Sequence, residues 1–179
     1  RTALIFLLGY LMYWFPFIQE SASGWSVKPI QETRVLGVLQ RIALCYGIAS
    51  LLIYFLQTRW VIAITLFLLV IYRFLLSHYG DLTLEGNAVL ALDRWLMGDS
   101  HLYHGEGVAF DPEGWLSTLP AIGNVVIGYL AGVYIQSKGK TYEGLTHLLL
   151  AGASLVAVGY FWDSSFPINK KLWTSSFVL

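Results

Sequence analysis

Apolar segments of membrane-spanning length recur along this chain, and they restrict its fold more than any other feature. A bilayer core about 30 Å thick is crossed by roughly 20 apolar helical residues, and backbone inside lipid must satisfy its own hydrogen bonds. The strand-like alternation of polar and apolar residues is absent. We therefore predict an all-α fold, a polytopic transmembrane helix bundle with five helices and the start of a sixth. The expected ranges, within one bundle over 1–179, are 2–17, 35–56, 60–76, 116–135, 145–162 and 172–179.

The composition agrees with a protein whose main partner is the lipid bilayer. Hydrophobic residues make up 56% of the chain and charged residues 12%, with a mean hydropathy of +0.62, whereas soluble domains carry about 25% charged residues. The 11 basic and 11 acidic residues cancel, so we expect no nucleic-acid partner. Cys45 is the single cysteine, which excludes an internal disulfide.

The orientation in the membrane follows from the short connections. Segments 57–59 and 136–144 carry basic residues, which favours the cytoplasmic side for both. Every acidic residue except Glu143 then falls on the other side. We predict a multi-pass protein whose 77–113 connection faces away from the cytoplasm.

The 77–113 connection is long, and we expect it to contain structure. Connections of this length usually serve as lids or binding segments. Helically spaced apolar residues predict a short amphipathic helix over 88–97 at the membrane interface, with Asp93 and Arg94 on its polar side.

His101 and His104 follow that helix three residues apart. This spacing would suit two metal ligands on one helical turn, but Gly105 and Gly107 disfavour a helix there and no cysteine lies nearby. We predict no metal site. The alternative left open is that these histidines lie at the interface or contact a substrate.

Two carboxylates, Asp111 and Glu113, stand at the mouth of the apolar run 116–135. Ionisable groups beside a bilayer are costly unless solvated or paired, so they suggest a working site, and both are candidate catalytic residues. The alternative is an ordinary helix start, with Asp111 as the N-cap, Pro112 in the first turn and Glu113 complementing the helix dipole.

Arg34 and Arg41 form a second constellation at the entry to segment 35–56. With Gly37 they are spaced i, i+3 and i+7, which predicts a shared helical stripe. The planar guanidinium binds both oxygens of a carboxylate or phosphate, so the stripe suits a bound anion. The alternative is an ion pair with one of the two acids across the bundle, and both interpretations hold if that pair lines a cavity.

Two further polar patterns concern packing and the membrane interface. Asn169, Lys170 and Trp173 lie at the entry to the last apolar run, where spacing alone favours an interfacial tryptophan with lysines reaching the headgroups. Asn124, Gly128 and Gly132 are spaced i, i+4 and i+8, a stripe that is typical of close helix packing.

Three motifs in this order resemble the heparan-α-glucosaminide N-acetyltransferase family. They are Gly-Val-Leu-Gln-Arg (37–41), Phe-Asp-Pro-Glu-Gly (110–114) with Leu-Pro-Ala-Ile (119–122) after it, and Pro-Ile-Asn-Lys-Lys-Leu-Trp-Thr-Ser-Ser-Phe-Val (167–178). The resemblance spans nearly the whole chain. It is nearest to the bacterial branch of N-acetylglucosamine-related membrane proteins.

The resemblance implies a multi-pass acyltransferase of the bacterial inner (cytoplasmic) membrane. It would take acetyl-CoA from the cytoplasmic side and acetylate an amino sugar or glycan on the other side. The residues that the resemblance and the chemistry together mark for substrate or cofactor binding are Arg34, Gln40, Arg41, Asn169, Lys170 and Trp173.

One departure from the family pattern concerns the catalytic histidine. The family's proposed histidine belongs to a His-x-x-Trp-x-Gly-like stretch that has no counterpart in 1–179, and no histidine of this chain matches it. We therefore expect an incomplete chain that holds part of a site. The alternatives are a membrane transporter of N-acetylglucosamine or a related sugar, although no inverted repeat is visible, and a membrane scaffold without a substrate. A homo-oligomer also stays open.

Overall fold

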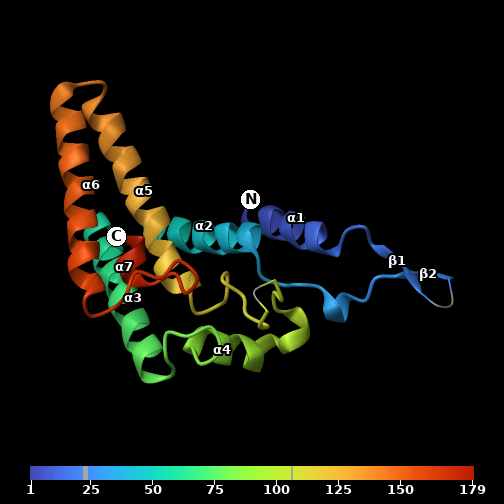
Figure 1. Ribbon diagram of the computed structural model, residues 1–179. Helices are drawn as coiled ribbons and strands as arrows, with labels where there is room; N and C mark the ends of the chain where they lie inside the picture. Colours follow the sequence, from blue (N-terminus) through green and yellow to red (C-terminus); the bar gives the residue numbers. More distant parts are fainter. Residues whose placement is uncertain (22–23, 106) are drawn as a thin grey trace.

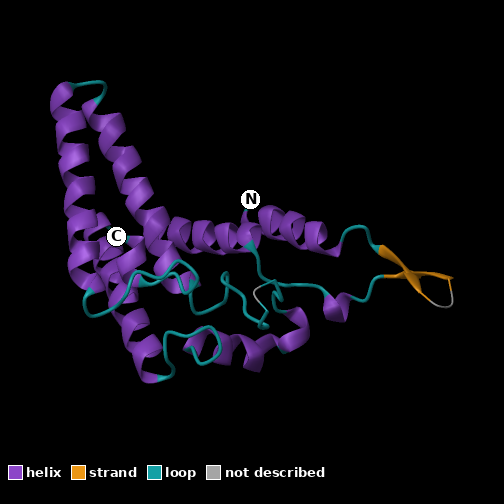
Figure 2. Ribbon diagram, viewed as in Figure 1, coloured by secondary structure: helices purple, strands orange, loops and turns teal. Residues whose placement is uncertain are grey.

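The computed structural model describes residues 1–21, 24–105 and 107–179, and its secondary structure is mostly helical (Figures 1 and 2). The predicted all-α membrane bundle is confirmed. The elements in chain order are α1 (Thr2–Trp14), β1 (Ile18–Ser21), β2 (Gly24–Val27), the 3-10 helix η1 (Ile30–Glu32), α2 (Val38–Phe55), α3 (Thr58–His78), α4 (Ala88–Met97), the 3-10 helix η2 (Asp99–His101), α5 (Thr118–Lys138), α6 (Tyr142–Asp163) and α7 (Ser175–Val178).

Helices α2, α3, α5 and α6 are each long and apolar enough to cross a membrane. Helix α1 has 13 residues and packs antiparallel along α2. Its Gly9 lies against Gln40 and its Tyr13 against Gly37, and Thr2 at its start lies against Gly47.

The first helix is shorter than predicted. It ends at Trp14 instead of residue 17, because a residue that precedes proline is disfavoured in helical conformation and Pro16 follows. An antiparallel hairpin of β1 and β2 comes next, with Ile18 paired to Val27. The sequence analysis did not foresee this hairpin, which projects at one end of the molecule in Figure 1.

Other boundaries also differ from the prediction, among them three at the start of a helix or run. Helix α2 begins at Val38 because Gly37 is fully extended, with φ −167° and ψ −173°. Helix α5 begins at Thr118, two residues late, and the last run is helical only over α7, since 169–174 forms turns. The predicted helix over 88–97 is confirmed as α4.

The packing stripe predicted at Gly128 and Gly132 is wrong. A Cβ atom added at either glycine would meet no described atom within 4 Å. These glycines face open space because α6, the neighbour of α5 along the chain, makes few close contacts with it.

Two apolar cores hold the bundle together. One, around Cys45, Val61 and Ile122, joins α2, α3 and α5. The other joins the end of α3 to α4 and to the loops that carry Phe110 and Phe166. The second core therefore supports the segment that follows Phe110, which Figure 1 shows between α4 and the α1–α2 pair.

Candidate functional site

The segments 34–41, 111–117 and 167–178 are far apart in sequence but meet at the turn 111–117. Arg34 reaches this turn from the segment before α2, Arg41 from the first turn of α2, and Trp173 covers Arg41 from the C-terminal segment. The second core lies beneath the turn. The fold thus brings residues of all three motifs together.

Arg34 forms the centre of a charged cluster. Its Nε donates to Asp111 Oδ2 at 2.9 Å and its Nη2 to Asp111 Oδ1 at 2.7 Å and to Glu113 Oε2 at 2.6 Å. The two parallel bonds to Asp111 are the strong, bidentate form of this pair. Asp111 is fully buried, whereas Arg34 and Glu113 retain 15% and 17% of their side-chain exposure. Glu113 is therefore the carboxylate that solvent or a ligand can reach.

Two tyrosines enclose the Arg34 guanidinium. Tyr13 OH accepts from Nη1 at 3.1 Å, and Cζ lies 5.0 Å from the Tyr13 ring centroid and 4.7 Å from that of Tyr103, within cation–π range. Burial lowers the pKa of Arg34, but the hydrogen bond and charge of Asp111, with Tyr13 and Glu113, outweigh it and raise the pKa above its usual value. The sequence analysis missed both tyrosines, since no local pattern links them to Arg34.

The predicted helical stripe of Arg34, Gly37 and Arg41 is wrong. Arg34 and Gly37 lie in the extended segment before α2, and only Arg41 is helical. The alternative, an arginine paired with the acids across the bundle, is what the structure shows. Both arginines nevertheless converge on the turn 111–117.

Arg41 is 6% exposed and only partly hydrogen-bonded. Its Nη2 donates to the Pro112 carbonyl and to Ser117 Oγ, and its Cζ lies 4.7 Å from the Trp173 ring centroid. Among the described residues, its Nε and Nη1 have no partner, and neither has the side-chain amide of the fully buried Gln40. Buried polar groups are nearly always hydrogen-bonded, so a further partner for these groups is expected at this place.

The turn itself is held by local hydrogen bonds. Asp111 Oδ1 accepts the Glu113 N–H at 3.0 Å, and Ser117 Oγ donates at 3.1 Å to the carbonyls of Pro112 and Gly114. The N-cap of α5 is Ser117. The helix-start interpretation of Asp111 is therefore wrong, because α5 begins only after this turn.

Asp93 of α4 supports the turn from the other side. It is 0% exposed, and its Oδ1 accepts the Trp115 N–H at 3.0 Å. Burial raises its pKa to about 7; the Trp115 N–H opposes this shift, the charge of Asp111 adds to it, and Arg41 also opposes it. Sequence reasoning placed Asp93 on a polar interfacial side, which the structure contradicts.

The three C-terminal candidates, Asn169, Lys170 and Trp173, lie in different surroundings. Asn169 Oδ1 accepts the N–H groups of Lys171 at 2.9 Å and Leu172 at 3.2 Å, so it shapes the turn. Trp173 packs on Arg41 and donates from Nε1 to Asn124 Oδ1 at 3.0 Å. Lys170 is exposed and stands apart from the charged cluster in the described part of the chain. Of these candidates, Trp173 is the one that lines the site.

The histidines do not form a metal centre in the described part of the chain. His101 Nδ1 lies 2.7 Å from the Thr33 carbonyl and links η2 to the segment before Arg34, while His104 is exposed. Within 1–21, 24–105 and 107–179, no three His, Cys, Asp or Glu side chains are grouped to hold a metal ion.

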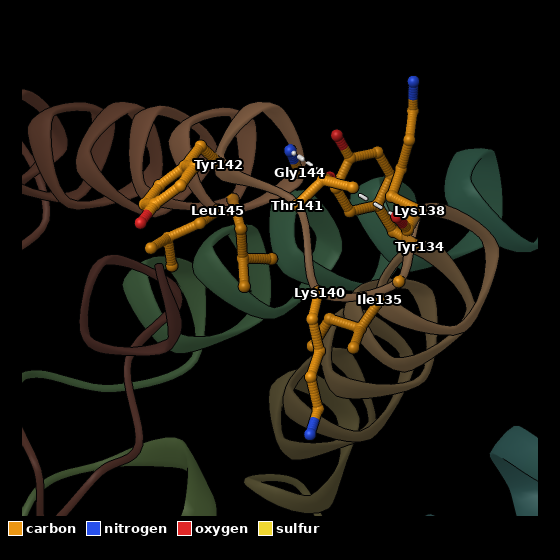
Figure 3. A pocket seen from close by; sticks show the side chains of 10 residues that line it. Tyr134, Ile135, Lys138, Lys140, Thr141, Tyr142, Gly144 and Leu145 are labelled. Atoms are coloured by element: carbon orange, nitrogen blue, oxygen red, sulfur yellow. Dashed lines mark hydrogen bonds between the residues drawn. The ribbon is translucent and has the colours of Figure 1, made fainter.

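The larger hollows lie away from this cluster. A cavity of about 670 Å³ between α3, α5 and α6 is lined by apolar residues with Tyr134 and His147 at one end. A hollow of about 480 Å³ lies at the α5–α6 turn, where Figure 3 shows Lys138 and Lys140 pointing away from each other. Two diverging lysines do not converge on one anion, so the chemistry favours the charged cluster over these hollows.

The comparisons with known proteins agree with the motifs. No family model matches the chain. Heparan-alpha-glucosaminide N-acetyltransferase of Mus musculus is 37% identical over 109 residues, and that of Homo sapiens is 34% identical over 109 residues. Each match covers 52% of this chain and 16% of the relative. The chain thus spans about a sixth of the length of these two relatives, and they belong to the same family that its three ordered motifs resemble.

Proposed function

We propose that this chain is part of a membrane N-acetyltransferase that transfers an acetyl group from acetyl-CoA to the amine of an amino sugar on the non-cytoplasmic side. The relatives and the membrane-spanning helices support the class of protein. The observation that carries the proposal is the buried Arg41 with unused N–H donors beside a turn whose Glu113 remains partly exposed. The proposed location is a bacterial inner membrane.

Acetyl transfer to an amine needs a base and hydrogen-bond donors such as those at this turn. The amine nitrogen attacks the thioester carbonyl, a proton leaves the amine, and the carbon–sulfur bond breaks to release the CoA thiol. A base must take the proton, and donors must stabilise the developing oxyanion. Glu113 is the proposed amine-contacting carboxylate because it is reachable, while the fully buried Asp111 fixes Arg34. The free N–H groups of Arg41 would serve the oxyanion or a CoA phosphate.

The remaining candidates take supporting roles in this proposal. Gln40 adds an unpaired buried amide on the same turn of α2 as Arg41. Trp173 holds the Arg41 guanidinium under its ring. Lys170 is exposed and would contact an anionic group at the rim, whereas Asn169 acts through the turn that it shapes.

Calorimetry with the purified full-length protein tests the donor assignment. Native protein should bind acetyl-CoA, and Arg41→Lys should bind at least tenfold more weakly, because an ammonium lacks the planar fork. Arg59→Lys is the matched control, since Arg59 is exposed at the start of α3. Absence of binding by the native protein at millimolar acetyl-CoA would contradict the proposal, and sugar uptake by reconstituted protein would then favour a transporter.

A further inference from the structure

Asp93 is a buried acid that the proposed chemistry does not use. It lies on α4 with no solvent exposure, and its Oδ1 accepts one hydrogen bond, from the Trp115 N–H. Its Oδ2 has no partner among the described residues. A buried carboxylate with one hydrogen bond is costly to a fold, so its presence beside the turn calls for a physical account.

The backbone at Gly114 fits closely against this carboxylate. A Cβ atom at Gly114 would collide with Asp93 Oδ2 and would come within 2.6 Å of Val89 Cγ1. Glycine is thus required for α4 to approach the turn. The approach places the Asp93 carboxylate directly against the backbone that joins Glu113 to Trp115.

Charged and titratable groups surround Asp93 from three other elements. Arg41 of α2 and Asp111 of the turn both act on its charge, and the charge of Asp93 in turn acts on Tyr72 of α3. The Trp115 N–H is the direct contact. A change in the charge of Asp93 therefore alters the electrostatic environment of the turn that supplies the partners of Arg34 and Arg41.

We propose that Asp93 is a positioning residue of the site, whose carboxyl group holds the turn 111–117 through the Trp115 N–H. This inference rests on the proposed function for its effect on acetyl transfer, but its structural part stands alone. An ionised acceptor makes a stronger single bond than a neutral one, but burial of the charge outweighs that bond and favours the protonated carboxyl group. The turn should therefore be held more tightly below the pKa of Asp93 than above it.

Cys45 provides a reporter that does not depend on activity. It is 2% exposed, and its Sγ lies 3.9 Å from the carbonyl of Thr118, the first residue of α5 after the turn. Loosening of the turn should expose this thiol. Its rate of reaction with N-ethylmaleimide can be followed in the full-length protein, with any cysteine outside this chain replaced.

The variants separate the hydrogen bond from the charge. Asp93→Ala removes both, and at pH 6 Cys45 should react at least tenfold faster than in the native protein. Asp93→Asn keeps a neutral acceptor, so its rate relative to native should be near one at pH 6 and should fall several-fold by pH 8, where the native carboxylate is ionised. Asp99→Asn is the control, because Asp99 is exposed at the start of η2 and pairs with the exposed Arg94.

The outcomes are distinct. A native labelling rate in Asp93→Ala overturns the inference. If Asp93→Ala does not fold, a constant Asp93→Asn to native ratio from pH 6 to pH 8 overturns it instead. If the labelling pattern holds and acetyl transfer falls at least tenfold in Asp93→Ala, both proposals are supported. If the pattern holds but the native full-length protein transfers no acetyl group, the positioning role stands and the proposed function fails.

Discussion

The turn 111–117 and the α5–α6 turn both carry charged residues next to apolar helices, but they place them in different surroundings. At the first turn, Arg34, Arg41 and Asp111 are buried or nearly so, and two nitrogens of Arg41 have no partner within the described ranges. At the second, Lys138 and Glu143 form one exposed pair at 3.1 Å. Exposed pairs contribute little to stability, whereas buried charges are costly unless paired. The comparison teaches that the energetic cost of burying polar groups is concentrated at the first turn.

The largest expected effect comes from removing the central cation of the first turn. Arg34→Met leaves Asp111 buried without its partner, which costs about 3 to 5 kcal/mol of unfolding free energy. Lys138→Met, the matched change at the second turn, should leave the melting temperature unchanged within error. Thermal unfolding in detergent measures both. Equal melting temperatures for the two variants would break the comparison.

The pH dependence of stability should reveal Asp93. Its pKa is raised by burial from 3.8 to about 7 in the folded protein. Between these values the folded state keeps a proton that the unfolded chain has lost, so stability should fall as pH rises from about 4 to about 7 and then level off, by a few kcal/mol in all. Asp93→Asn should flatten this part of the profile. An unchanged profile in Asp93→Asn would show that another group titrates there.

Glu113 and Asp111 should differ in what their loss affects. Glu113→Gln removes the reachable charge, and acetyl transfer should fall tenfold or more, about 1.4 kcal/mol in the barrier, with little change in melting temperature. Asp111→Asn weakens the buried bidentate pair and should lower the melting temperature as well. Steady-state kinetics and thermal unfolding of both variants give the test. Full activity in Glu113→Gln would remove this residue from the site.

The smallest effect on the protein is expected from single cysteine substitutions at exposed positions. They test on which side of the membrane each of the two regions lies. Ser100→Cys and Ser137→Cys, each in a Cys45→Ala background, place exposed thiols beside η2 and near the end of α5. An impermeant maleimide added to intact cells should label position 100, and position 137 only after permeabilisation. Labelling of position 137 alone in intact cells would invert the predicted orientation.

The spans were predictable from the sequence because their signal is local. Runs of apolar residues mark α2, α3, α5 and α6 directly, and the short helix over 88–97 follows from its spacing. The ion pairs of Arg34 were foreseen as an alternative because a cation and two acids beside a bilayer need partners. The boundaries set by Pro16 and Gly37 were missed because single residues override a periodic pattern.

The parts of the site that were missed depend on tertiary packing. Tyr13 meets Arg34 only because α1 lies along α2. Asp93 is polar in any local pattern, and its burial arises because α4 packs against Gly114. Such contacts join segments that are far apart in sequence, and no spacing within one segment encodes them.

The most direct test of the central claim is acetyl transfer by the purified full-length protein. With acetyl-CoA and glucosamine as substrates, the native protein and Lys138→Met should form N-acetylglucosamine at the same rate, and Arg41→Lys should form it at least tenfold more slowly with an unaltered KM for the sugar. Mass spectrometry of the product and release of free CoA thiol measure the reaction independently. No product from the native protein, or equal rates in all three proteins, would contradict a transfer site at the turn 111–117.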